Sequence, residues 1–502
     1  MAFITADERP LAVTLARLSY TNPFLPERIE CERTALGDDF VPAGPVWSVQ
    51  ADRAVQNPNV ARLGERAGAL ATRLHDSLAR GAAPSDADRL LYEDVVLYFL
   101  YSRYETDFLQ LILHADGGSR VGFYEKFAAD CGHFFRSRQD PAHLFACLFQ
   151  VRRAFHHIFW NIIGGSMSMA RLRAVVWQSI FTHDMRRYRR TLYAQMGDIT
   201  TLVVGPSGTG KELVARAIGL SRYIPFDAKT ERFAAHFADL FHPLNLSALS
   251  PTLIESELFG HRRGAYTGAL QDRAGWLEVC EPLGTVFLDE IGDVDVGIQV
   301  KLLRVLQTRT FQRLGDTKTL VFRGKIMAAT NRDLAHEIAT GRFREDFYYR
   351  LCSDLITTPP LEEQLRESPD ELPNLLRFIA RRVVGDDESR AIADEALVWI
   401  DRHLGRTYRW PGNVRELEQC VRNVLIRGEY RPQVARHANA TDELAAAITA
   451  GTLTADELLG RYCTLVYAQT GSYQETARRL GIDRRTVKSK VDPELLRAYG
   501  GS

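Results

Sequence analysis

The chain has 502 residues, of which 45% are hydrophobic and 25% charged, with 63 basic and 63 acidic side chains. At roughly 100–200 residues per domain this length predicts about three domains, and the ordinary composition excludes a mainly disordered, collagen-like or coiled-coil chain. The formal net charge of zero excludes a coat for nucleic acid, although a local basic module stays possible.

The cysteine pattern and the hydropathy of the N-terminal residues indicate the cellular compartment of the protein. Seven scattered cysteines, an odd number, indicate a reducing cytoplasm rather than a disulfide framework. No targeting segment is visible, because the charged run Asp7–Arg9 interrupts the N-terminus before an apolar run forms. The most apolar early stretch, 95–101, is shorter than the about 20 residues that a membrane-spanning helix needs. We therefore expect a cytoplasmic protein with no membrane partner.

Residues 1–160 are expected to form a helical domain. Pro84-Ser85 followed by Asp86 and Asp88 is typical of a helix start, since acids are favoured in the first turn. Dense Phe and Tyr between 123 and 160 indicate an aromatic core. Zinc or haem ligands are an alternative for four residues in this stretch, Cys131, His133, His143 and Cys147. Their spacing is not that of a standard finger, so buried thiols and imidazoles are the favoured interpretation.

The pattern changes near residue 162. Strand-like runs at 200–205, 284–290 and 324–330 alternate with helical sequence, which predicts a parallel sheet with crossover helices. A Pro- and Glu-rich break at 357–373 precedes more helical sequence. Residues 431–459 are rich in Ala and Thr and are interpreted as a linker with a weak helix, and 460–502 as a short, basic, helical segment.

A Gly-rich loop follows the apolar strand 201–204 and precedes a helical run, which is the context of a phosphate-binding loop. Its glycines would let backbone N–H groups turn toward phosphate oxygens. Lys211 would reach the β- and γ-phosphates. Glu212 stands where a hydroxyl ligand for magnesium is usual, so the metal must use other groups. The loop consists of Gly205, Pro206, Ser207, Gly208, Thr209, Gly210 and Lys211.

Two acids end the apolar strand 286–288. Asp289 would hold Mg²⁺, usually through water, and Glu290 would orient and deprotonate the attacking water. A strand-end acid pair that caps the next helix is the alternative. Asn331, which ends the strand 324–330, could sense the γ-phosphate, and a plain turn residue remains possible there.

Arg344 and Arg350 lie six residues apart on nearby faces of a predicted helix. They could supply positive charge to a phosphoryl group bound by a neighbouring subunit. The alternative is a pair of solvated arginines that form ion pairs with Glu345 and Asp346.

The stretch 264–269 places two glycines around an aromatic ring and a hydroxyl, and it is too Gly-rich for a stable helix. A mobile loop that displays Tyr266 to a protein partner is the favoured interpretation. A turn with a buried tyrosine is the alternative.

Residues 471–490 predict a helix-turn-helix, with six cations and two anions in a neutral chain. Ala477 would allow two helices to cross, Gly481 would make the turn and Val487 would pack the second helix. Asp483 would cap that helix. The residues expected to face DNA are Arg484, Arg485, Lys488 and Ser489. A basic surface hairpin is the alternative.

On seven motifs in family order the chain resembles the bacterial enhancer-binding proteins, the AAA+ activators of sigma-54 RNA polymerase. The resemblance covers about 162–427 and again 460–491. The motifs are IIGGSMSM (162–169), GPSGTGKE (205–212), ESELFGHRRGAYTGA (255–269), GTVFLDEIGD (284–293), AATNRDL (328–334), FREDFYYRL (343–351) and WPGNVREL (410–417).

The resemblance implies roles for single residues. Glu212 belongs to the family's phosphate loop, Asn245 restrains the catalytic Glu290, and Asn331 is the first sensor. Arg344 and Arg350 are intersubunit fingers, and Arg415 in the lid is the second sensor. The residues that touch the sigma factor are Gly264, Ala265, Tyr266, Thr267, Gly268 and Ala269.

The chain also departs from the family. Tyr266 replaces the more usual Phe, and LNLSAL around Asn245 is an uncommon form. The segment 181–198 is longer than usual and has no assigned role. Residues 1–160 match no sensory domain of the family.

The sequence thus predicts a multidomain α/β fold. A helical regulatory or sensory domain (1–160) precedes an AAA+ P-loop α/β domain (161–430) with a helical lid at about 359–430. A linker (431–459) and a helix-turn-helix domain (460–502) follow. The predicted function is that of an ATP- and Mg²⁺-dependent activator that remodels the closed promoter complex.

The expected partners are sigma-54 RNA polymerase, enhancer DNA, an unknown signal at residues 1–160, and further copies of the chain as a hexamer, or as a dimer when inactive. Two alternatives remain. One is a DNA-tethered AAA+ remodeller of a different protein partner, and the other is a DNA-binding repressor with a vestigial ATPase.

Overall fold

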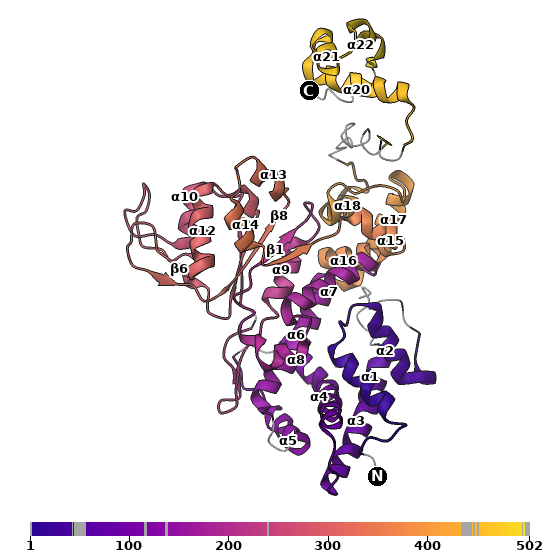
Figure 1. Ribbon diagram of the computed structural model, residues 1–502, viewed down its shortest axis with the longest axis vertical. Coiled ribbons are helices and arrows are strands. Elements are labelled where there is room, and N and C mark those ends of the chain that lie inside the picture. The colour runs from indigo at the N-terminus through magenta and orange to yellow at the C-terminus, as the bar shows by residue number, and fades with distance from the viewer. Residues whose placement is uncertain are drawn as a thin grey trace. The chain divides into compact units, whose positions relative to one another are not determined.

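The computed structural model describes residues 3–42, 44, 57–114, 118–135, 139–237, 240–432, 444, 447–448, 451–493 and 495–496. The chain divides into two compact units, Met1–Gly428 and Glu429–Ser502, and each is described by itself. Figure 1 labels the helices and strands of both units. Within the described ranges, no helix combines the length and the apolar character that a membrane crossing requires.

The first part of the chain is helical, as predicted. Its elements are α1 (Arg9–Tyr20), α2 (Pro26–Leu36), η1 (Gly37–Asp39), α3 (Pro58–Ala79), α4 (Asp86–His114), α5 (Tyr124–Phe135) and α6 (Pro141–Asn161). Helix α4 begins at the predicted residue, and the Ser85 hydroxyl accepts a hydrogen bond from the backbone N–H of Asp88 at 3.1 Å.

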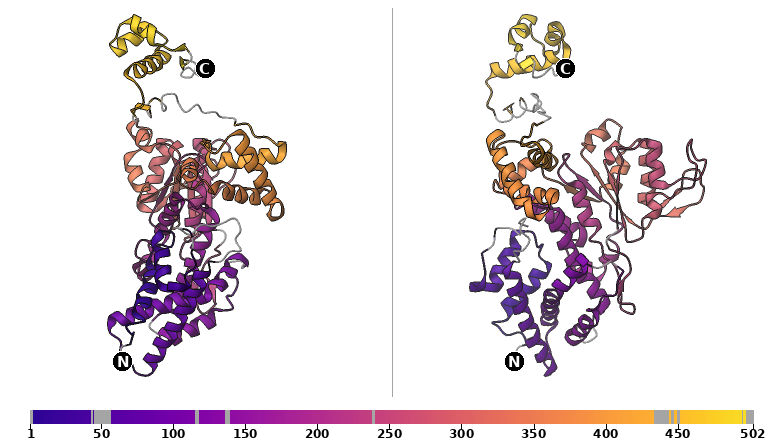
Figure 2. Two further views of the ribbon diagram at one scale, coloured as in Figure 1. Left: turned by 90° about the vertical axis from the view of Figure 1, so that its right-hand side faces the viewer. Right: turned by 180° about the vertical axis from the view of Figure 1, so that it is seen from behind.

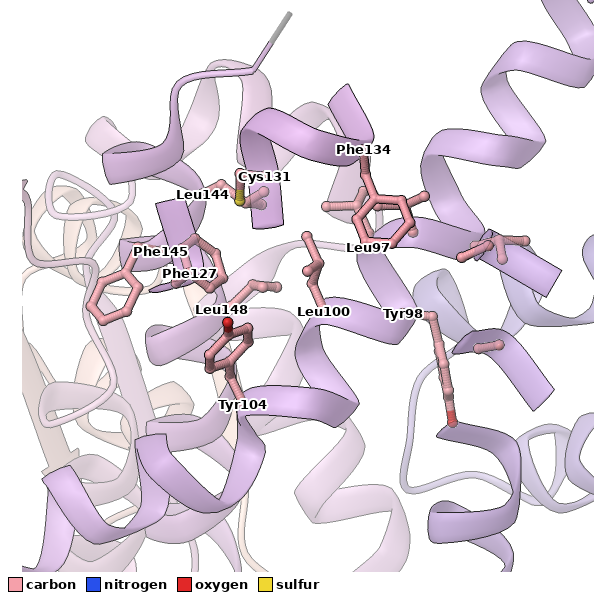
Figure 3. Packing of buried hydrophobic residues seen from close by; sticks show 14 of the residues in the cluster. Leu97, Tyr98, Leu100, Tyr104, Phe127, Cys131, Phe134, Leu144, Phe145 and Leu148 are labelled. Atoms are coloured by element: carbon pink, nitrogen blue, oxygen red, sulfur yellow. The ribbon is translucent and has the colours of Figure 1, made fainter. Parts of the chain in front are cut away.

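These helices enclose an aromatic core. Phe108, Phe127 and Phe145 are fully buried, and the rings of Phe127 and Phe145 lie 5.1 Å apart in an edge-on arrangement. Figure 3 shows Phe127, Cys131 and Leu144 gathered around the same spot. The Phe145 ring also lies 4.6 Å from Phe226, which belongs to the central part of the chain. The two parts therefore share one core, and the division near residue 160 stays a prediction.

A five-stranded parallel sheet forms the centre of the first unit, as the alternation of strand and helix predicted. Its order is β4-β5-β8-β1-β9. The strands are β1 (Thr201–Val204), β4 (Phe241–Asn245), β5 (Thr285–Asp289), β8 (Lys325–Thr330) and β9 (Asp354–Thr357). All six residues of β8 are buried, which suits a central strand covered on both faces.

Helices cover both faces of this sheet (Figures 1 and 2). Along β1, Val203 packs in the cluster that contains α7 and α9, whereas Leu202 packs in the cluster that contains α10, α12 and α14. The helices are α7 (Met167–Phe181), α8 (Met185–Arg190), η2 (Leu192–Ala194), α9 (Lys211–Gly219), α10 (Pro251–Phe259), α11 (Trp276–Val279), η3 (Ile291–Asp293), α12 (Val296–Thr308), α13 (Leu334–Ala339) and α14 (Glu345–Leu351).

Two short hairpins and a helical lid complete the first unit. The hairpins pair β2 (Phe226–Asp227) with β3 (Arg232–Phe233) and β6 (Thr310–Phe311) with β7 (Leu320–Val321). The lid helices follow β9, and Gly428 ends the last of them with a left-handed backbone. They are α15 (Leu361–Glu367), α16 (Glu371–Val384), α17 (Asp386–His403) and α18 (Asn413–Arg427).

The second unit contains α20 (Ala455–Thr470), α21 (Tyr473–Leu480) and α22 (Arg484–Lys490). Helix α20 begins inside the stretch that the sequence predicted as a linker, because Thr454 and Glu457 form a reciprocal capping box. Most of that stretch, at 433–443, 445–446 and 449–450, lies outside the described residues.

Candidate active site

The carboxyl ends of the parallel strands bring the predicted site residues to one edge of the sheet. Val204 pairs in register with Thr330, and Asn245 with Asp289. Strand β1 has β8 on one side and β9 on the other. After β1 the chain forms β4, β5 and β8 on one side of it and then β9 on the other side. The position where the strand order reverses is called a switch point, and ligands of open α/β sheets bind there.

The Gly-rich loop after β1 needs its glycines. Gly205, Gly208 and Gly210 have φ values of 150°, 79° and 87°, which other residues resist. A Cβ atom at Gly205 would lie 2.1 Å from the Thr358 hydroxyl, and one at Gly208 would lie 2.3 Å from the Gly412 carbonyl. The loop is therefore held against β9 and the lid, and its shape follows from this close packing.

Lys211 opens α9 directly behind this loop. Its Nζ donates to the carbonyls of Gly205 at 3.1 Å and Pro206 at 3.2 Å. Burial lowers the pKa of Lys211, and the charges of Glu290 and Asp289 partly oppose this shift. The lysine and both acids are thus close enough to act on one another electrostatically.

Asp289 and Glu290 form a half-buried carboxylate pair at the end of β5. Burial raises the pKa of both, and the charge of Asp289 adds to the shift at Glu290, while Lys211 works against it. Glu290 Oε2 accepts a hydrogen bond from the backbone N–H of Asn331 at 3.4 Å. Glu290 also has a φ of 55°, a costly backbone for a non-glycine residue and one that clusters at functional sites.

The donor set suits a hard cation. Carboxylate oxygens are the ligands that Mg²⁺ prefers, and Asp289 and Glu290 supply them side by side. Glu212 forms an ion pair with Arg216 at 3.3 Å, and its charge adds to the rise in the pKa of Asp289. The Thr209 hydroxyl donates to the Pro206 carbonyl. The two acids of β5 therefore fit a magnesium ion better than the residues that follow the loop.

Asn245 lies beside Asp289 but does not contact Glu290 through a hydrogen bond. Its Oδ1 instead accepts from the backbone N–H of Ser247 at 3.0 Å and from the Ser247 hydroxyl at 2.9 Å. The predicted restraint on Glu290 stays a prediction.

The start of α18 in the lid contacts the phosphate loop. Arg415 Nη1 donates to the Ser207 hydroxyl at 3.0 Å, which places the predicted second sensor at the loop. The backbone N–H of Val414 donates to the Gly208 carbonyl at 3.1 Å.

Asn413 is a lid residue that sequence reasoning missed. Its Nδ2 donates to the Ser207 carbonyl at 2.9 Å, and its Oδ1 accepts from the Leu361 N–H at 2.8 Å. Asn413 has a φ of 54°, a backbone that Asn tolerates better than most residues. A Gly-Asn pair before a helical run was the signal that could have revealed it.

Arg344 and Arg350 mark the two ends of α14, and Phe347 and Leu351 bury its other face. The Arg344 guanidinium pairs with Asp346 at 2.8 Å, as the alternative interpretation proposed. Arg350 is exposed, and its guanidinium has no partner among the described residues. Both arginines are therefore presented at the surface.

The loop 264–269 rises from a clamped base. Arg262 forms ion pairs with Asp272 and with Asp316, the latter at 2.8 Å. The backbone N–H of Gly264 donates to the Ala269 carbonyl at 2.8 Å and closes the loop.

The tip of this loop is partly exposed. Tyr266 is half-buried, with its ring 5.1 Å from the His261 ring. Thr267 and Gly268 are exposed, and Leu270 has 81% of its surface exposed. The arrangement lies between the two sequence interpretations, since the tyrosine packs on its own domain while its neighbours face outward. Leu270 was not singled out, although an apolar residue directly after a Gly-rich tip is a usable signal.

The predicted DNA-contacting residues lie on an exposed face of α22. Asp483 caps this helix as predicted, because its carboxylate accepts from the Arg485 N–H at 2.7 Å. Val487 is fully buried against the neighbouring helices. Within the described part of the chain, no ion pair engages the side chains of Arg484, Arg485 and Lys488, and Ser489 is exposed beside them. By contrast, Arg478 and Arg479 both pair with Glu475.

The cysteine and histidine group of the N-terminal helices is not arranged as a metal site. Both ring nitrogens of His143 are within hydrogen-bond distance of other groups, the Tyr223 hydroxyl at 2.9 Å and the Arg189 carbonyl at 2.7 Å. Across the ranges that the structure describes, no group of three or more His, Cys, Asp or Glu side chains could hold a metal ion.

Comparisons with known proteins give the family of this site. Residues 180–357 match the family described as the sigma-54 interaction domain. The chain is 40% identical over 309 residues to the transcriptional regulatory protein ZraR of Klebsiella oxytoca, which covers 59% of this chain and 63% of that protein. It is 45% identical over 232 residues to the Nif-specific regulatory protein of Azotobacter vinelandii, which covers 46% of this chain and 40% of that protein.

The chain thus spans less than two thirds of the length of these relatives. Among solved structures, NtrX from Brucella abortus aligns over 81% of this chain and 86% of its own, with a TM-score of 0.40 and 21% identity. The matched region contains the phosphate loop, the carboxylate pair and the loop 264–269. Residues 180–357 therefore form a sigma-54 interaction domain, and the relatives that match this region are a transcriptional regulatory protein and a Nif-specific regulatory protein.

Proposed function

We propose that the chain is an ATPase that activates sigma-54 RNA polymerase from enhancer DNA, and that it works as a ring of identical subunits. The observation that carries the proposal is the convergence of Lys211, Asp289 and Glu290 at one edge of the sheet, with Arg415 of the lid on the same loop. The sigma-54 interaction domain contains Lys211, Asp289 and Glu290, and it also contains the loop 264–269, where Thr267 and Gly268 are exposed.

The chain's own groups can perform phosphoryl transfer to water. Backbone N–H groups of the loop 205–210 and the N-terminus of α9 would hold the phosphates, with Lys211 neutralising their charge. Glu290 would take the proton of the attacking water, and its raised pKa favours that transfer. A magnesium ion held by Asp289 would supply charge neutralisation between the phosphates. Asn331, whose backbone N–H donates to Glu290 at 3.4 Å, would report the state of the phosphate.

Arg344 and Arg350 would complete the site of a neighbouring subunit. Both are exposed on α14, and Arg344 is committed only to a surface ion pair with Asp346. Such a pair is weak because solvent screens it, so the arginine can change partners.

The loop 264–269 would carry the movement to the sigma factor. Gly264 and Gly268 have φ values of 81° and 105°, and nothing lies within 4 Å of a Cβ at either position. The tip is therefore free of close packing at both glycines and can change shape with the nucleotide.

The second unit would tether the protein to its enhancer. Helix α22 presents three cations that form no ion pair with any described residue, Arg484, Arg485 and Lys488. They lie next to a tight turn at Gly481, an arrangement that suits a helix in the major groove. Two copies would read half-sites about 34 Å apart, one turn of DNA.

The test is an ATPase assay and an open-complex assay on the full chain with sigma-54 RNA polymerase and a linear enhancer template. We expect ATP-dependent opening of the promoter. Hydrolysis without capture of sigma-54 would favour the remodeller of another protein partner. DNA binding without hydrolysis would favour the repressor.

A further inference from the structure

A cavity of about 1090 Å³ lies inside the first unit, where the N-terminal helices meet the central domain. Its described walls come from α1, α4, α6, α7 and α8, together with Arg28 of α2, residues 41, 42 and 44, and the start of α3. Figure 1 shows α4, α6, α7 and α8 along this part of the chain. Pockets of roughly 300–1,000 Å³ hold small molecules, so this cavity is large enough for one.

The lining is mainly aromatic and aliphatic. Phe155 and Phe159 of α6 face Trp177 and Phe181 of α7, and Tyr101 of α4 adds a ring with a hydroxyl. Within the described residues, the Tyr101 hydroxyl has no hydrogen-bond partner. An apolar ligand body would therefore replace water against these rings, and it would meet a free hydroxyl.

The charges of the lining favour an anion. Among the described residues, three arginines contribute to it, Arg28, Arg152 and Arg189, against one carboxylate, that of Glu105. Arg28 is engaged with Glu32 at 2.8 Å. Arg152 is half-buried and forms no ion pair or hydrogen bond with any described residue, although its charge partly opposes the rise that burial causes in the pKa of Glu105. Arg189 Nη1 is buried without a hydrogen-bond partner among the described residues. A guanidinium group with free N–H donors can bind a carboxylate through two parallel hydrogen bonds.

We propose that this cavity binds a small molecule with an apolar body and one carboxylate, and that this ligand regulates ATP hydrolysis. Arg152 would hold the carboxylate, and the rings of α6 and α7 would hold the body. Binding stands apart from the proposed function, whereas the regulation rests on it.

Helix α6 gives the route from the cavity to the phosphate loop. One face of α6 lines the cavity, and another is bonded to the end of α9. Gln150 Nε2 donates to the Ser221 carbonyl at 2.9 Å, and Arg153 Nη1 donates to the Arg222 carbonyl at 3.2 Å. Arg153 is almost fully buried, so the contact between α6 and the residues that follow α9 is closely packed. Because α9 begins at Lys211, a displacement of α6 is transmitted to the phosphate-binding lysine.

Helix α8 supplies a second link and gives the long segment 181–198 a role. Arg186 pairs with the buried Asp94 of α4, and the Tyr188 hydroxyl donates to Gln150 Oε1 at 2.8 Å. Met185, Tyr188 and Arg189 of the same helix line the cavity. The segment thus ties α4 and α6 together around the ligand.

The binding test uses the full chain and two fluorescent probes, 1-pyrenebutyrate and its uncharged analogue 1-pyrenebutanol. We expect saturable binding of the acid, about tenfold tighter than that of the alcohol. Arg152→Gln should remove this preference. Thr106→Trp, at an exposed lining position of α4, should weaken both probes, whereas Gln110→Trp, one turn further and outside the lining, should not.

Three results would overturn the site: no saturable binding, equal affinity for acid and alcohol, or equal effects of the two tryptophan variants at unchanged melting temperature. For regulation, 1-pyrenebutyrate should change the ATP hydrolysis rate about twofold or more in the native chain and not in Arg152→Gln. Binding with an unchanged rate would overturn the regulatory half. Absence of ATP hydrolysis under all conditions would contradict the proposed function. The binding titration with the two pyrene probes would still decide whether the cavity is a ligand site.

Discussion

Lys211, Asp289 and Glu290 show how single residues set the chemistry of the site. Burial disfavours the charged form of each group, so it lowers the pKa of Lys211 and raises the pKa of both acids. The charge of Lys211 opposes this effect at the acids, and the charges of the acids oppose it at Lys211. Glu290 is further constrained by its left-handed backbone, which ends β5 and aims the side chain toward Asn331. A strained acid with a raised pKa beside a lysine is a good candidate for a general base.

Glu290→Gln should therefore keep ATP binding and lose most hydrolysis, by about 10²–10⁴-fold. The amide keeps the shape of the side chain but cannot accept a proton. Lys211→Ala should instead lose ATP binding itself. Turnover and nucleotide affinity of the purified chains would distinguish the two. Glu281→Gln is the control, because Glu281 is an exposed carboxylate before β5, at the other end of the strand from the acid pair. Hydrolysis by Glu290→Gln at the native rate would remove Glu290 from its role.

At the scale of elements, the loop 264–269 and helix α22 both carry the exposed side chains that are proposed to contact a partner. The loop stands on a base fixed by Arg262 and its two aspartates, and α22 stands on the buried Val487. A rigid base under an exposed tip lets the tip change its partner without unfolding the domain.

Thr267→Ala should leave ATP hydrolysis and DNA binding near native levels and abolish promoter opening. The side chain is exposed and has no acid-base chemistry suited to ATP, so stability should change by less than about 0.5 kcal/mol. Tyr266→Phe should keep function because the ring contact with His261 remains, and Tyr266→Ala should lose it.

The readout for this loop is capture of sigma-54 in a transition-state analogue complex. Thr252→Ala is the matched control, since Thr252 is an exposed threonine on α10 of the same domain. Normal promoter opening by Thr267→Ala would show that the loop does not couple hydrolysis to the sigma factor.

Arg484→Ala and Arg485→Ala should weaken enhancer binding and reduce the salt dependence of the binding constant by about one unit of slope for each lost phosphate contact. Arg478→Ala should weaken it less, because Arg478 is committed to Glu475 at 2.7 Å. Footprints at several salt concentrations measure this. Equal footprints for the Arg484, Arg485 and native chains would contradict the DNA-binding role of α22.

The elements that the sequence predicted are those with local signals. Alternating strand and helix predicted the parallel sheet, and Asp483 predicted the start of α22. The shared core of α6 with the β2–β3 hairpin was not predictable, because Phe145 and Phe226 meet only through long-range packing. The contact of Asn413 with Ser207 depends in the same way on the docking of the lid.

At the scale of the whole molecule, Arg415 of the lid is the one arginine among the described residues whose side chain donates a hydrogen bond to the Gly-rich loop 205–210. Within the described residues, Arg344 contacts Asp346 on its own helix, and Arg350 has no charged partner. The formal net charge of zero allows copies of the chain to approach without strong repulsion. A ring of subunits would bring α14 of one copy to the phosphates of the next.

Mixtures of two inactive variants should therefore regain activity. Arg344→Ala subunits keep Glu290, and Glu290→Gln subunits keep Arg344, so a ring that contains both has some interfaces with the acid on one side and the arginine on the other. Each variant alone should lose about 10³-fold or more of the native rate, as arginine fingers do elsewhere. The mixture should reach a clear fraction of that rate, with a maximum near equal amounts. Arg342→Ala is the control, because Arg342 is committed to Glu337 at 2.6 Å and should leave hydrolysis unchanged. If no ratio of the two variants exceeds the rates of the separate chains, Arg344 acts within its own subunit or not at all.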